Sequence, residues 1–442
     1  MSNISEAQST SEISDAGARE AARVNTLMFA RLMPLLVVGY LLNFLDRTNI
    51  ALAKAALQTD LGISAAAYGL GAGLFFLTYS VCQVPSNLVL QRVGARRWIT
   101  LIVGTWGCVS TAMALVNGPA SFYALRVLLG VAEAGMFPGV MFYLTGWFGT
   151  RQRAQAIGYF LLGSSFANIL GGPVGGALLG LEGKVGLHGW QWLFLIEGLP
   201  AILFAFAVWK LLPDSPASAP WLTKAEAEGV QARLAAERAQ ASRDGEAIPV
   251  SKVFVNPHLL LAIVCYFFHQ IALYGVTFFL PAIIRAWGGL SELQIGLLTA
   301  LPWVATGIGC VVLPRLAMSM RKPQWFVTGG FFLMAVSFAA PLVLPPGPAL
   351  AAFCFGNLFL SAVQSVLFTF PASRFHGAAL AAGLGFLNTL GILGGFAGPY
   401  AIGLVEQNTG KASNGLLLIS GALVIATIGA AFLRYPFEDK KA

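Results

Sequence analysis

Ile169-Leu-Gly-Gly-Pro-Val-Gly-Gly-Ala-Leu-Leu-Gly180 recurs 223 residues later as Ile392-Leu-Gly-Gly-Phe-Ala-Gly-Pro-Tyr-Ala-Ile-Gly403, and six of the twelve positions are identical. The offset is about half of the 442-residue chain, which predicts two related halves. Small residues recur in membrane helices because they let backbones approach closely, so low-complexity coincidence is the alternative. Both segments fall in the fifth apolar span of their half, which favours a duplication.

The composition is that of a membrane protein. The chain is 57% hydrophobic and only 10% charged, with a mean hydropathy of +0.73, whereas soluble domains carry about 25% charge. Residues 1–31 are polar and contain no apolar core of a signal peptide, so we expect none to be cleaved. The five cysteines fall in apolar spans without metal-ligand spacing, so we expect no metal and no cofactor other than the proton as coupling ion.

Apolar runs of about 20 residues predict membrane-spanning helices. The twelve runs cover residues 32–56, 67–90, 97–116, 121–144, 154–180, 190–212, 257–284, 292–316, 324–344, 349–371, 378–405 and 413–433. Twenty-one of the 27 basic residues fall in the termini or in the loops after even-numbered spans, which predicts cytoplasmic termini. Four fall on the other face, namely Lys54, Lys184, Arg285 and Lys411, and two lie inside spans. The net charge of +8 thus reflects topology in a bacterial-type inner membrane, and we expect no nucleic-acid partner.

These features predict an all-α membrane protein in which two pseudo-symmetric six-helix bundles are joined by a cytoplasmic linker. The expected organisation is a cytoplasmic tail (1–31), an N-terminal bundle (32–212), the linker (213–256), a C-terminal bundle (257–433) and a second cytoplasmic tail (434–442). Residues 221–240 of the linker are rich in Ala, Glu and Arg and predict a surface helix.

Four ionisable residues lie well inside two apolar stretches near the front of the chain: Asp46 and Arg47 in one, Arg126 and Glu133 in the other. A charge at mid-membrane costs about 2.5–3.5 kcal/mol on insertion scales, so such residues usually mark an ion or substrate path. Arg126 and Glu133 are two helical turns apart, roughly 10.5 Å along the axis, which is too far for a direct pair. Asp46 and Arg47 are neighbours that point about 100° apart. We therefore expect neutralisation across helices, and with both acids ionised the four charges sum to zero.

This zero sum suggests how transport and protonation could be linked. A bound monocarboxylate would make the buried set negative by one, and uncompensated buried charge is costly, so Asp46 or Glu133 should take up a proton. A dicarboxylate would call for two protons. Arg47 and Arg126 are the expected carboxylate clamps, because a guanidinium suits bidentate recognition. The alternative is a permanent ion-pair network that only ties spans 1 and 4 together.

Several motifs resemble one family. They are Asn43-Phe-Leu-Asp-Arg-Thr-Asn49, Val84-Pro-Ser-Asn-Leu-Val-Leu-Gln-Arg-Val-Gly-Ala-Arg-Arg-Trp98, Arg126-Val-Leu-Leu-Gly-Val-Ala-Glu-Ala-Gly135 and Trp190-Gln-Trp-Leu-Phe-Leu-Ile-Glu-Gly-Leu-Pro200. Together they are similar, over essentially the whole chain, to the anion:cation symporters of the major facilitator superfamily, and within it to bacterial permeases for tartrate, phthalate-type and sugar acids. The resemblance implies alternating access, monomeric function, proton coupling by Asp46 and Glu133, and anion binding by Arg126.

One position departs from the family pattern. The loop between spans 2 and 3 normally carries an acid before its arginine, and here Gln91 precedes Arg92. The conformational latch implied by the resemblance is then either weaker or depends on the remaining loop residues. We place that latch at Arg92, Gly94, Arg96 and Arg97.

Neutral polar residues complete the predicted substrate site. In the first half they are Asn43, Tyr79 and Ser164, and in the second half His269, Gln270, Tyr274, Ser361, Gln364, Ser365 and Asn388. Interhelical hydrogen bonding is the alternative for each second-half residue, and an interfacial or packing role is the alternative for Tyr79. His269 could be a proton relay or a hydrogen-bonded helix residue, and it is the only acidic or basic residue that we place well inside a span of the second half. We leave Glu197 out of the site, as a structural residue near the outer interface.

A proton-coupled symporter that imports a small organic carboxylate, whether mono- or dicarboxylate, hydroxylated or aromatic, fits these features best. An exchanger or facilitator without net proton movement is the nearest alternative, and a transporter-like sensor is a third. No nucleotide-binding loop or hydrolase motif occurs, so no enzymatic activity is expected.

Overall fold

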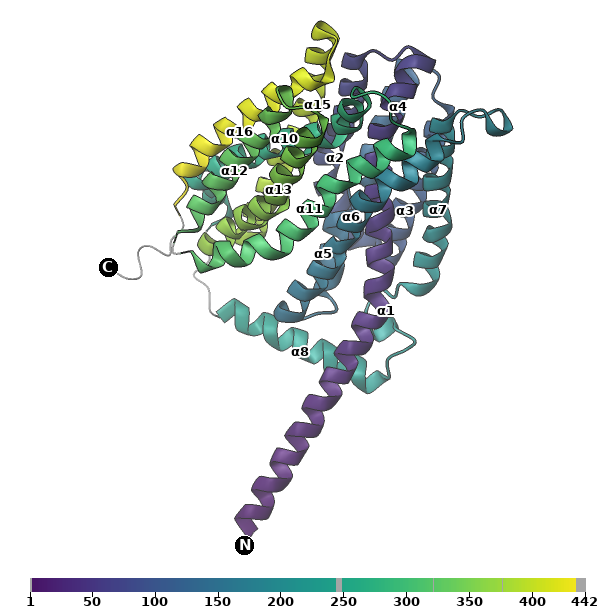
Figure 1. The fold of residues 1–442 in the computed structure, drawn as a ribbon. Coiled ribbons are helices and arrows are strands. Elements are labelled where there is room, and N and C mark those ends of the chain that lie inside the picture. Colours follow the sequence, from purple (N-terminus) through teal and green to yellow (C-terminus); the bar gives the residue numbers. More distant parts are fainter. Residues whose placement is uncertain (1, 244–248, 321, 376, 435–442) are drawn as a thin grey trace.

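The computed structural model describes residues 2–243, 249–320, 322–375 and 377–434, and these ranges form helices joined by loops (Figure 1). Within them twelve helical segments are long and apolar enough to cross a membrane, which confirms the twelve predicted spans. The predicted tail 434–442 lies outside the described residues apart from Arg434, as does the linker segment 244–248.

The first half contains seven α-helices and two short 3₁₀ helices. They are α1 (Ser2–Leu61), α2 (Ala65–Val93), α3 (Ala95–Ala112), η1 (Met113–Leu115), α4 (Pro119–Glu133), α5 (Met136–Thr145), α6 (Thr150–Leu179), η2 (Lys184–Gly186) and α7 (Gly189–Leu211). The fourth span, predicted as one helix over 121–144, is interrupted at Ala134 and Gly135, directly after Glu133. One of the four intramembrane charges therefore lies at a helix end inside the bilayer.

The linker and second half follow the same plan. Their elements are η3 (Pro216–Ser218), α8 (Lys224–Arg243), α9 (Val250–Phe254), α10 (Pro257–Arg285), α11 (Glu292–Ser319), α12 (Pro323–Ala339), η4 (Ala340–Leu342), α13 (Pro346–Arg374), α14 (Gly377–Gly391), α15 (Gly394–Thr409), η5 (Ala412–Asn414) and α16 (Gly415–Ala431). The eleventh span, predicted as one helix over 378–405, is divided between α14 and α15 by a turn at residues 392–393. Glycines flank that turn on both sides, and glycine is a poor residue for a helix interior.

Side-chain caps explain several of these helix starts. Ser64 accepts from the N–H of Ala67 at the start of α2, and Asn256 accepts from the N–H groups of His258 and Leu259 at the start of α10. Such caps satisfy backbone donors that a helix leaves unpaired. The boundary between α2 and α3 is set instead by Gly94, whose φ of 92° other residues rarely adopt.

The linker helix α8 packs on the first half. Arg23 of α1 pairs with Glu226 of α8, and Arg233 Nη2 donates to Asn25 Oδ1 at 2.9 Å. In Figure 1, α8 crosses the end of the bundle from which the N-terminal part of α1 projects. We call this end the linker side and the opposite end the distal side.

The repeated segment explains how the two halves meet. In α6, an added Cβ at Gly171 or Gly175 would meet α1, whereas one at Gly172 would collide with the carbonyl oxygen of Gly296 in α11. The second copy, in α15, behaves the same way: Gly394 packs against α10 of its own half. One row of small residues thus contacts the first helix of the same half, and the adjacent row contacts the other half.

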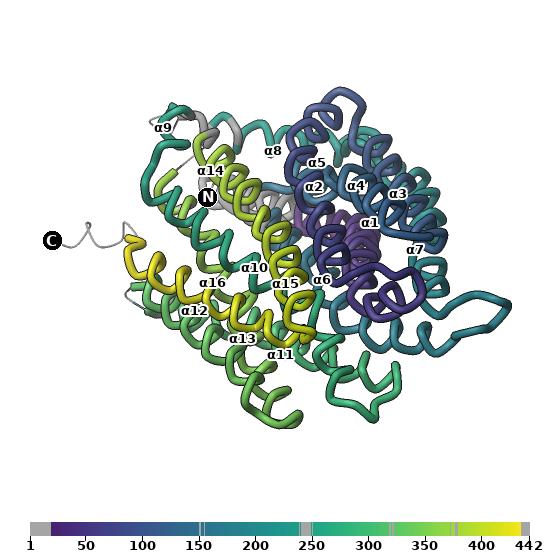
Figure 2. Tube along the Cα trace, turned by 90° about the horizontal axis from the view of Figure 1, so that it is seen from above, coloured from purple at the N-terminus to yellow at the C-terminus, as the bar shows by residue number. Residues whose placement is uncertain are grey.

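Two close seams join the halves toward the distal side, α2 against α15 and α6 against α11. Figure 2 shows these helix pairs between the two halves. In the first seam the Pro399 carbonyl lies so close to Gly69 that no Cβ would fit, and in the second seam Gly176 approaches the Glu292 carbonyl in the same way. Since backbones touch directly, any larger residue would separate the halves.

An ion pair also joins the halves, and it corrects one prediction. Lys54, predicted toward the outer face of the membrane, is fully buried in α1, and its Nζ lies 2.6 Å from both carboxylate oxygens of Glu406. The second half was expected to offer no ionic group but His269, because Glu406 falls one residue beyond the predicted end of its span. Helix α15 in fact continues to Thr409 and carries Glu406 into the contact.

We predict that Glu406→Gln weakens closure of the distal side, because Lys54 would remain buried without a charged partner. A cysteine placed at the buried Ala72 of α2, in a background without the five native cysteines, should then react several-fold faster with a membrane-impermeant maleimide. Exchanging the charges (Lys54→Glu with Glu406→Lys) should restore slow labelling. Equal labelling rates in the parent and Glu406→Gln would contradict a closing role.

Candidate functional site

An ion pair between the first and fourth spans lies at the centre of the first half. Arg47 Nε donates to Glu133 Oε2 at 2.7 Å, and the two side chains are 6% and 0% exposed. The pair joins α1 to the end of α4, so two of the four intramembrane charges are neutralised across helices. The second carboxylate oxygen of Glu133 has no hydrogen-bond partner among the described residues.

Aromatic rings surround the Arg47 guanidinium. Its Cζ lies 4.6 Å from the Tyr79 ring centroid, 5.0 Å from that of Phe44 and 5.2 Å from that of Phe75. Tyr274, from α10 in the other half, also lies beside it. Ring faces attract cations, and this attraction grows when water is excluded. Tyr79 and Tyr274, both predicted, are therefore close to the charged cluster.

Arg126 has no carboxylate partner within ion-pair distance among the described residues, although it is only 1% exposed. Its Nε and Nη2 point to the carbonyl oxygens of Gly71 and Ala72 at 3.3 and 3.4 Å, which is long for hydrogen bonds. Its guanidinium lies 4.8 Å from the centroid of Phe75, whose ring therefore contacts both arginines. A buried cation held only by weak neutral contacts is suited to receive an anion.

Asp46 points away from Arg47, onto α3. Ser110 Oγ donates to Asp46 Oδ1 at 2.6 Å, Trp106 lies beside the carboxyl group, and Oδ2 has no hydrogen-bond partner among the described residues. The side chain is 3% exposed. This carboxyl group has a hydroxyl partner rather than a cation.

The remaining predicted residues divide into those near the junction of the halves and those bonded within one half. Asn43 is fully buried near Glu133. The Tyr274 ring lies 4.0 Å from that of Phe76, and Asn388 Nδ2 donates to Gln83 Oε1 at 3.3 Å, so both residues connect the halves. Nearby, Ser80 Oγ donates to the Thr389 carbonyl at 2.7 Å.

Other predicted residues are bonded within one half. Gln364 Nε2 donates to the Tyr266 hydroxyl at 3.2 Å. Ser164 Oγ donates to the Leu161 carbonyl of its own helix at 2.8 Å, and Ser365 Oγ donates to the Ser361 carbonyl at 2.7 Å. Serines bonded to their own helix in this way remain able to accept from a ligand.

His269 fits the role of a hydrogen-bonded helix residue. It is fully buried; its Nε2 lies 2.9 Å from the Leu360 carbonyl, and its Nδ1 lies 3.1 Å from the Gln270 side chain. Because a carbonyl only accepts, Nε2 donates the ring proton to Leu360. The Gln270 atom that faces Nδ1 is Oε1, which also accepts, so a neutral ring bonds to Gln270 only when the amide is turned to present its N–H. Both ring nitrogens thus face neutral groups.

Glu197 differs from its prediction. It was placed near the outer interface, yet it lies inside α7 with 4% exposure, and neither carboxylate oxygen makes a hydrogen bond within the described structure. Sequence inspection also missed Phe75, although it lies one helical turn before Tyr79 on the same face of α2. Ser110 had no signal, because a serine in an apolar span usually bonds to its own helix.

The predicted latch residues lie on the linker side. The Arg96 backbone N–H donates to Asp214 Oδ1 at 2.8 Å, and the Arg96 side chain donates to the Trp209 carbonyl and lies over the Trp209 ring. Gly94 is close to the same carboxylate. Asp214, in the segment that follows α7, thus contacts this loop, where Gln91 stands in place of the acid that the family pattern led us to expect. Arg92 and Arg97 are exposed.

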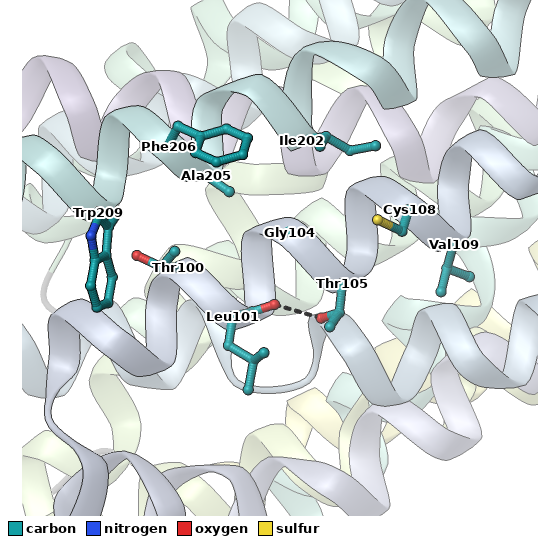
Figure 3. A pocket seen from close by; sticks show the side chains of 10 residues that line it. All are labelled: Thr100, Leu101, Gly104, Thr105, Cys108, Val109, Ile202, Ala205, Phe206 and Trp209. Atoms are coloured by element: carbon teal, nitrogen blue, oxygen red, sulfur yellow. Dashed lines mark hydrogen bonds between the residues drawn. The ribbon is translucent and has the colours of Figure 1, made fainter.

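A groove of about 620 Å³ between α3 and α7 lies outside the charged cluster (Figure 3). It is lined by Thr100, Leu101, Gly104, Thr105, Cys108, Val109, Ile202, Ala205, Phe206 and Trp209. None of these residues is charged, and Leu101 and Phe206 are more than half exposed on the outside of the bundle. In a membrane this surface contacts hydrocarbon, so the groove does not extend the candidate site.

We predict that the Arg47–Glu133 pair contributes to stability only as a pair. Arg47→Gln or Glu133→Gln alone leaves one buried charge unpaired and should cost about 3–5 kcal/mol. The double variant, with two neutral amides, should recover most of that loss. Unfolding of the purified variants measures the effect, and a double variant that loses the sum of both single losses would contradict the pairing.

Known transporters match this chain over most of its length. The family model described as Major Facilitator Superfamily matches residues 36–399. A "Quinolone resistance transporter" of Acinetobacter baumannii is 39% identical over 427 residues, 95% of this chain and 96% of that protein. A protein of Agrobacterium vitis named for tartrate transport is 39% identical over 407 residues, 92% of this chain and 93% of that protein.

Solved structures agree on the fold. A bacterial homologue of the human lysosomal transporter Spinster superimposes with a TM-score of 0.72 at 18% identity, covering 91% of this chain and 96% of that one. The family and these relatives consist of transporters rather than enzymes.

Proposed function

Because the chain belongs to the major facilitator superfamily and is a multi-pass membrane transporter, we propose that it imports a small organic carboxylate together with protons. Transport proceeds by alternating access in a bacterial-type inner membrane, with cytoplasmic termini and a monomer as the functional unit. The single observation that carries this proposal is Arg126, a buried guanidinium without an acidic partner among the described residues, beside a buried ion pair that contains a carboxylate.

The substrate carboxylate binds to Arg126. A guanidinium stays charged inside a protein and offers parallel N–H donors that match a carboxylate, and the weak bonds to Gly71 and Ala72 cost little to give up. Tyr79 and Tyr274 lie beside Arg47 from the two halves, and their hydroxyl groups become available to the substrate when Arg47 turns toward it. The ring of Phe75 contacts both arginines.

Proton uptake compensates the added negative charge. Glu133 accepts a proton through its unpartnered oxygen, and the loss of its charge weakens the bond to Arg47. Arg47 can then turn its guanidinium toward the substrate. Asp46 accepts a proton at its own free oxygen without losing an ion pair. Protonation in this way keeps the intramembrane charges and the bound carboxylate neutral in sum. It therefore removes the electrostatic cost of the change between the outward-facing and inward-facing states.

The closed distal side corresponds to a state that faces the cytoplasm. Opening the other way requires that the α2–α15 and α6–α11 seams separate and that the Lys54–Glu406 pair breaks. The small residues of the repeat make both seams close-packed yet free of side chains that interlock. The two halves can therefore rock apart as rigid bodies.

The relatives support an organic substrate and leave a second candidate. The Agrobacterium vitis protein is named for tartrate, a hydroxylated dicarboxylate, which matches an arginine site with hydroxyl neighbours. The Acinetobacter baumannii protein is named for quinolone resistance, and quinolone antibiotics carry a carboxylate on an aromatic ring. Export of such aromatic acids in exchange for protons would use the same arginine and the aromatic residues around it.

We predict that a carboxylate substrate raises the thermal unfolding temperature of the purified protein. A ligand at 100 times its dissociation constant stabilises by about 2.7 kcal/mol, so a screen of hydroxylated, aromatic and dicarboxylic acids should reveal it. Arg126→Lys should lose this stabilisation, because a lysine cannot reproduce the bidentate contact. An unchanged response in that variant would remove Arg126 from the anion site.

We predict that Asp46→Asn abolishes uptake driven by a pH gradient but leaves substrate exchange across liposomes largely intact, since the arginines remain. Transport of the carboxylate found in the screen measures both activities. Pure facilitation or anion exchange would show uptake in the parent protein that a protonophore does not affect. Unchanged pH-driven accumulation in Asp46→Asn would contradict its coupling role.

A further inference from the structure

Glu197 is a third buried carboxyl group in the first half, and the mechanism above does not use it. It is 4% exposed in α7, and neither of its carboxylate oxygens has a hydrogen-bond partner in the described part of the chain. Its polar neighbour is Asn49, which is fully buried and uncharged. An ionised carboxylate in such a place would be costly.

Helix α3 brings Glu197 and Asp46 to the same level of the bundle. Ser110 donates to Asp46 at 2.6 Å, and the next residue, Thr111, packs against Gly198 so closely that an added Cβ would lie 2.6 Å from its N and Oγ1. Asp46 of α1 therefore contacts the same turn of α3 that Gly198 packs against. Glu197 is the residue before Gly198 in α7, so the two acids lie near one turn of α3 on different helices. They lie within electrostatic range of each other.

No described cation compensates Glu197 from the helices packed around it. On α1 the facing charge is Asp46, while Arg47 pairs with Glu133 and Lys54 with Glu406. The facing polar side chains of α3, Trp106, Ser110 and Thr111, are neutral. Helix α6 meets α7 through Gly175 and Leu193, and η1 contributes only apolar residues.

The charge balance of the first half is therefore not zero. Asp46, Glu133 and Glu197 face only Arg47 and Arg126, so full ionisation would leave one buried negative charge before any substrate binds. We propose that Asp46 and Glu197 form a carboxyl pair that shares one resident proton in the unloaded protein and holds two protons when substrate is bound. Glu197 thus acts as a positioning residue that keeps a proton beside Asp46.

The Asp46–Glu197 pair changes how many protons the first half can hold. Binding of a monocarboxylate is still accompanied by uptake of one proton, and binding of a dicarboxylate by uptake of two. With the resident proton, the dicarboxylate complex holds three protons, one on each of Asp46, Glu133 and Glu197. The resident proton comes from water during folding and stays in the pair, so each cycle moves only the added protons. Two acids in one buried region take up protons in a coupled way, because a second negative charge there is repelled by the first.

Infrared spectroscopy of the purified, substrate-free protein at neutral pH tests the resident proton without any transport. The parent should show the C=O stretch of a buried carboxylic acid. Both Glu197→Gln and Asp46→Asn should lose this band, since removing either acid makes the remaining charges sum to zero. Glu182→Gln should keep it, because the Gly189 N–H and His188 hold the pKa of Glu182 below its usual range and it stays ionised.

The spectra of the two variants test whether Asp46 and Glu197 share the proton. A band that persists in Glu197→Gln would show that Glu197 is ionised, and one lost in Glu197→Gln but kept in Asp46→Asn would place the proton on Glu197 alone; either result overturns sharing. A second measurement rests on the proposed function: half-maximal uptake in Glu197→Gln should move about one pH unit to the acid side, since Asp46 loses a negative neighbour. An unchanged pH profile overturns the coupling role, whereas absent uptake in the parent would overturn only the proposed transport.

Discussion

The Arg47–Glu133 ion pair determines how every other charge in the first half can be used. It occupies one arginine and one acid at 2.7 Å, inside a region with almost no exposure. What remains is a cation without an acidic partner, Arg126, and an acid bonded to a hydroxyl, Asp46. Because charges inside a membrane are costly unless compensated, this division is the basis on which we propose Arg126 for the anion and the acids for protons.

Aromatic residues surround the two arginines. Phe75 contacts both guanidinium groups, while Tyr79 and Tyr274 approach Arg47 from different halves. A ring face attracts a cation but does not occupy the N–H groups of a guanidinium. The arginines can therefore stay out of water while their N–H groups remain available to an anion. Any movement of one half against the other therefore changes the surroundings of Arg47 directly.

The duplicated segment links this site to the movement of the halves. Its two rows of small residues bring α6 and α15 close to a helix of the same half and to one of the other half. Larger side chains would hold the backbones apart, whereas these seams can close and open with little interlocking. The Lys54–Glu406 pair adds an electrostatic contact to the closed distal side.

Hydropathy, basic-residue positions and the internal repeat were sufficient to predict twelve spans in two halves, because lipid imposes length and polarity on every spanning helix. The same argument identified Asp46, Arg47, Arg126 and Glu133, since a charge in an apolar run is visible in the sequence alone. Which charges pair was not visible: the Glu133 partner is 86 residues away, and Lys54 finds Glu406 at a separation of 352. Spacing along one helix constrains neighbours only within that helix, so partners on different helices depend on how the bundle packs. Glu197 shows this most clearly, because only the packing of Gly198 on Thr111 brings it to the level of Asp46.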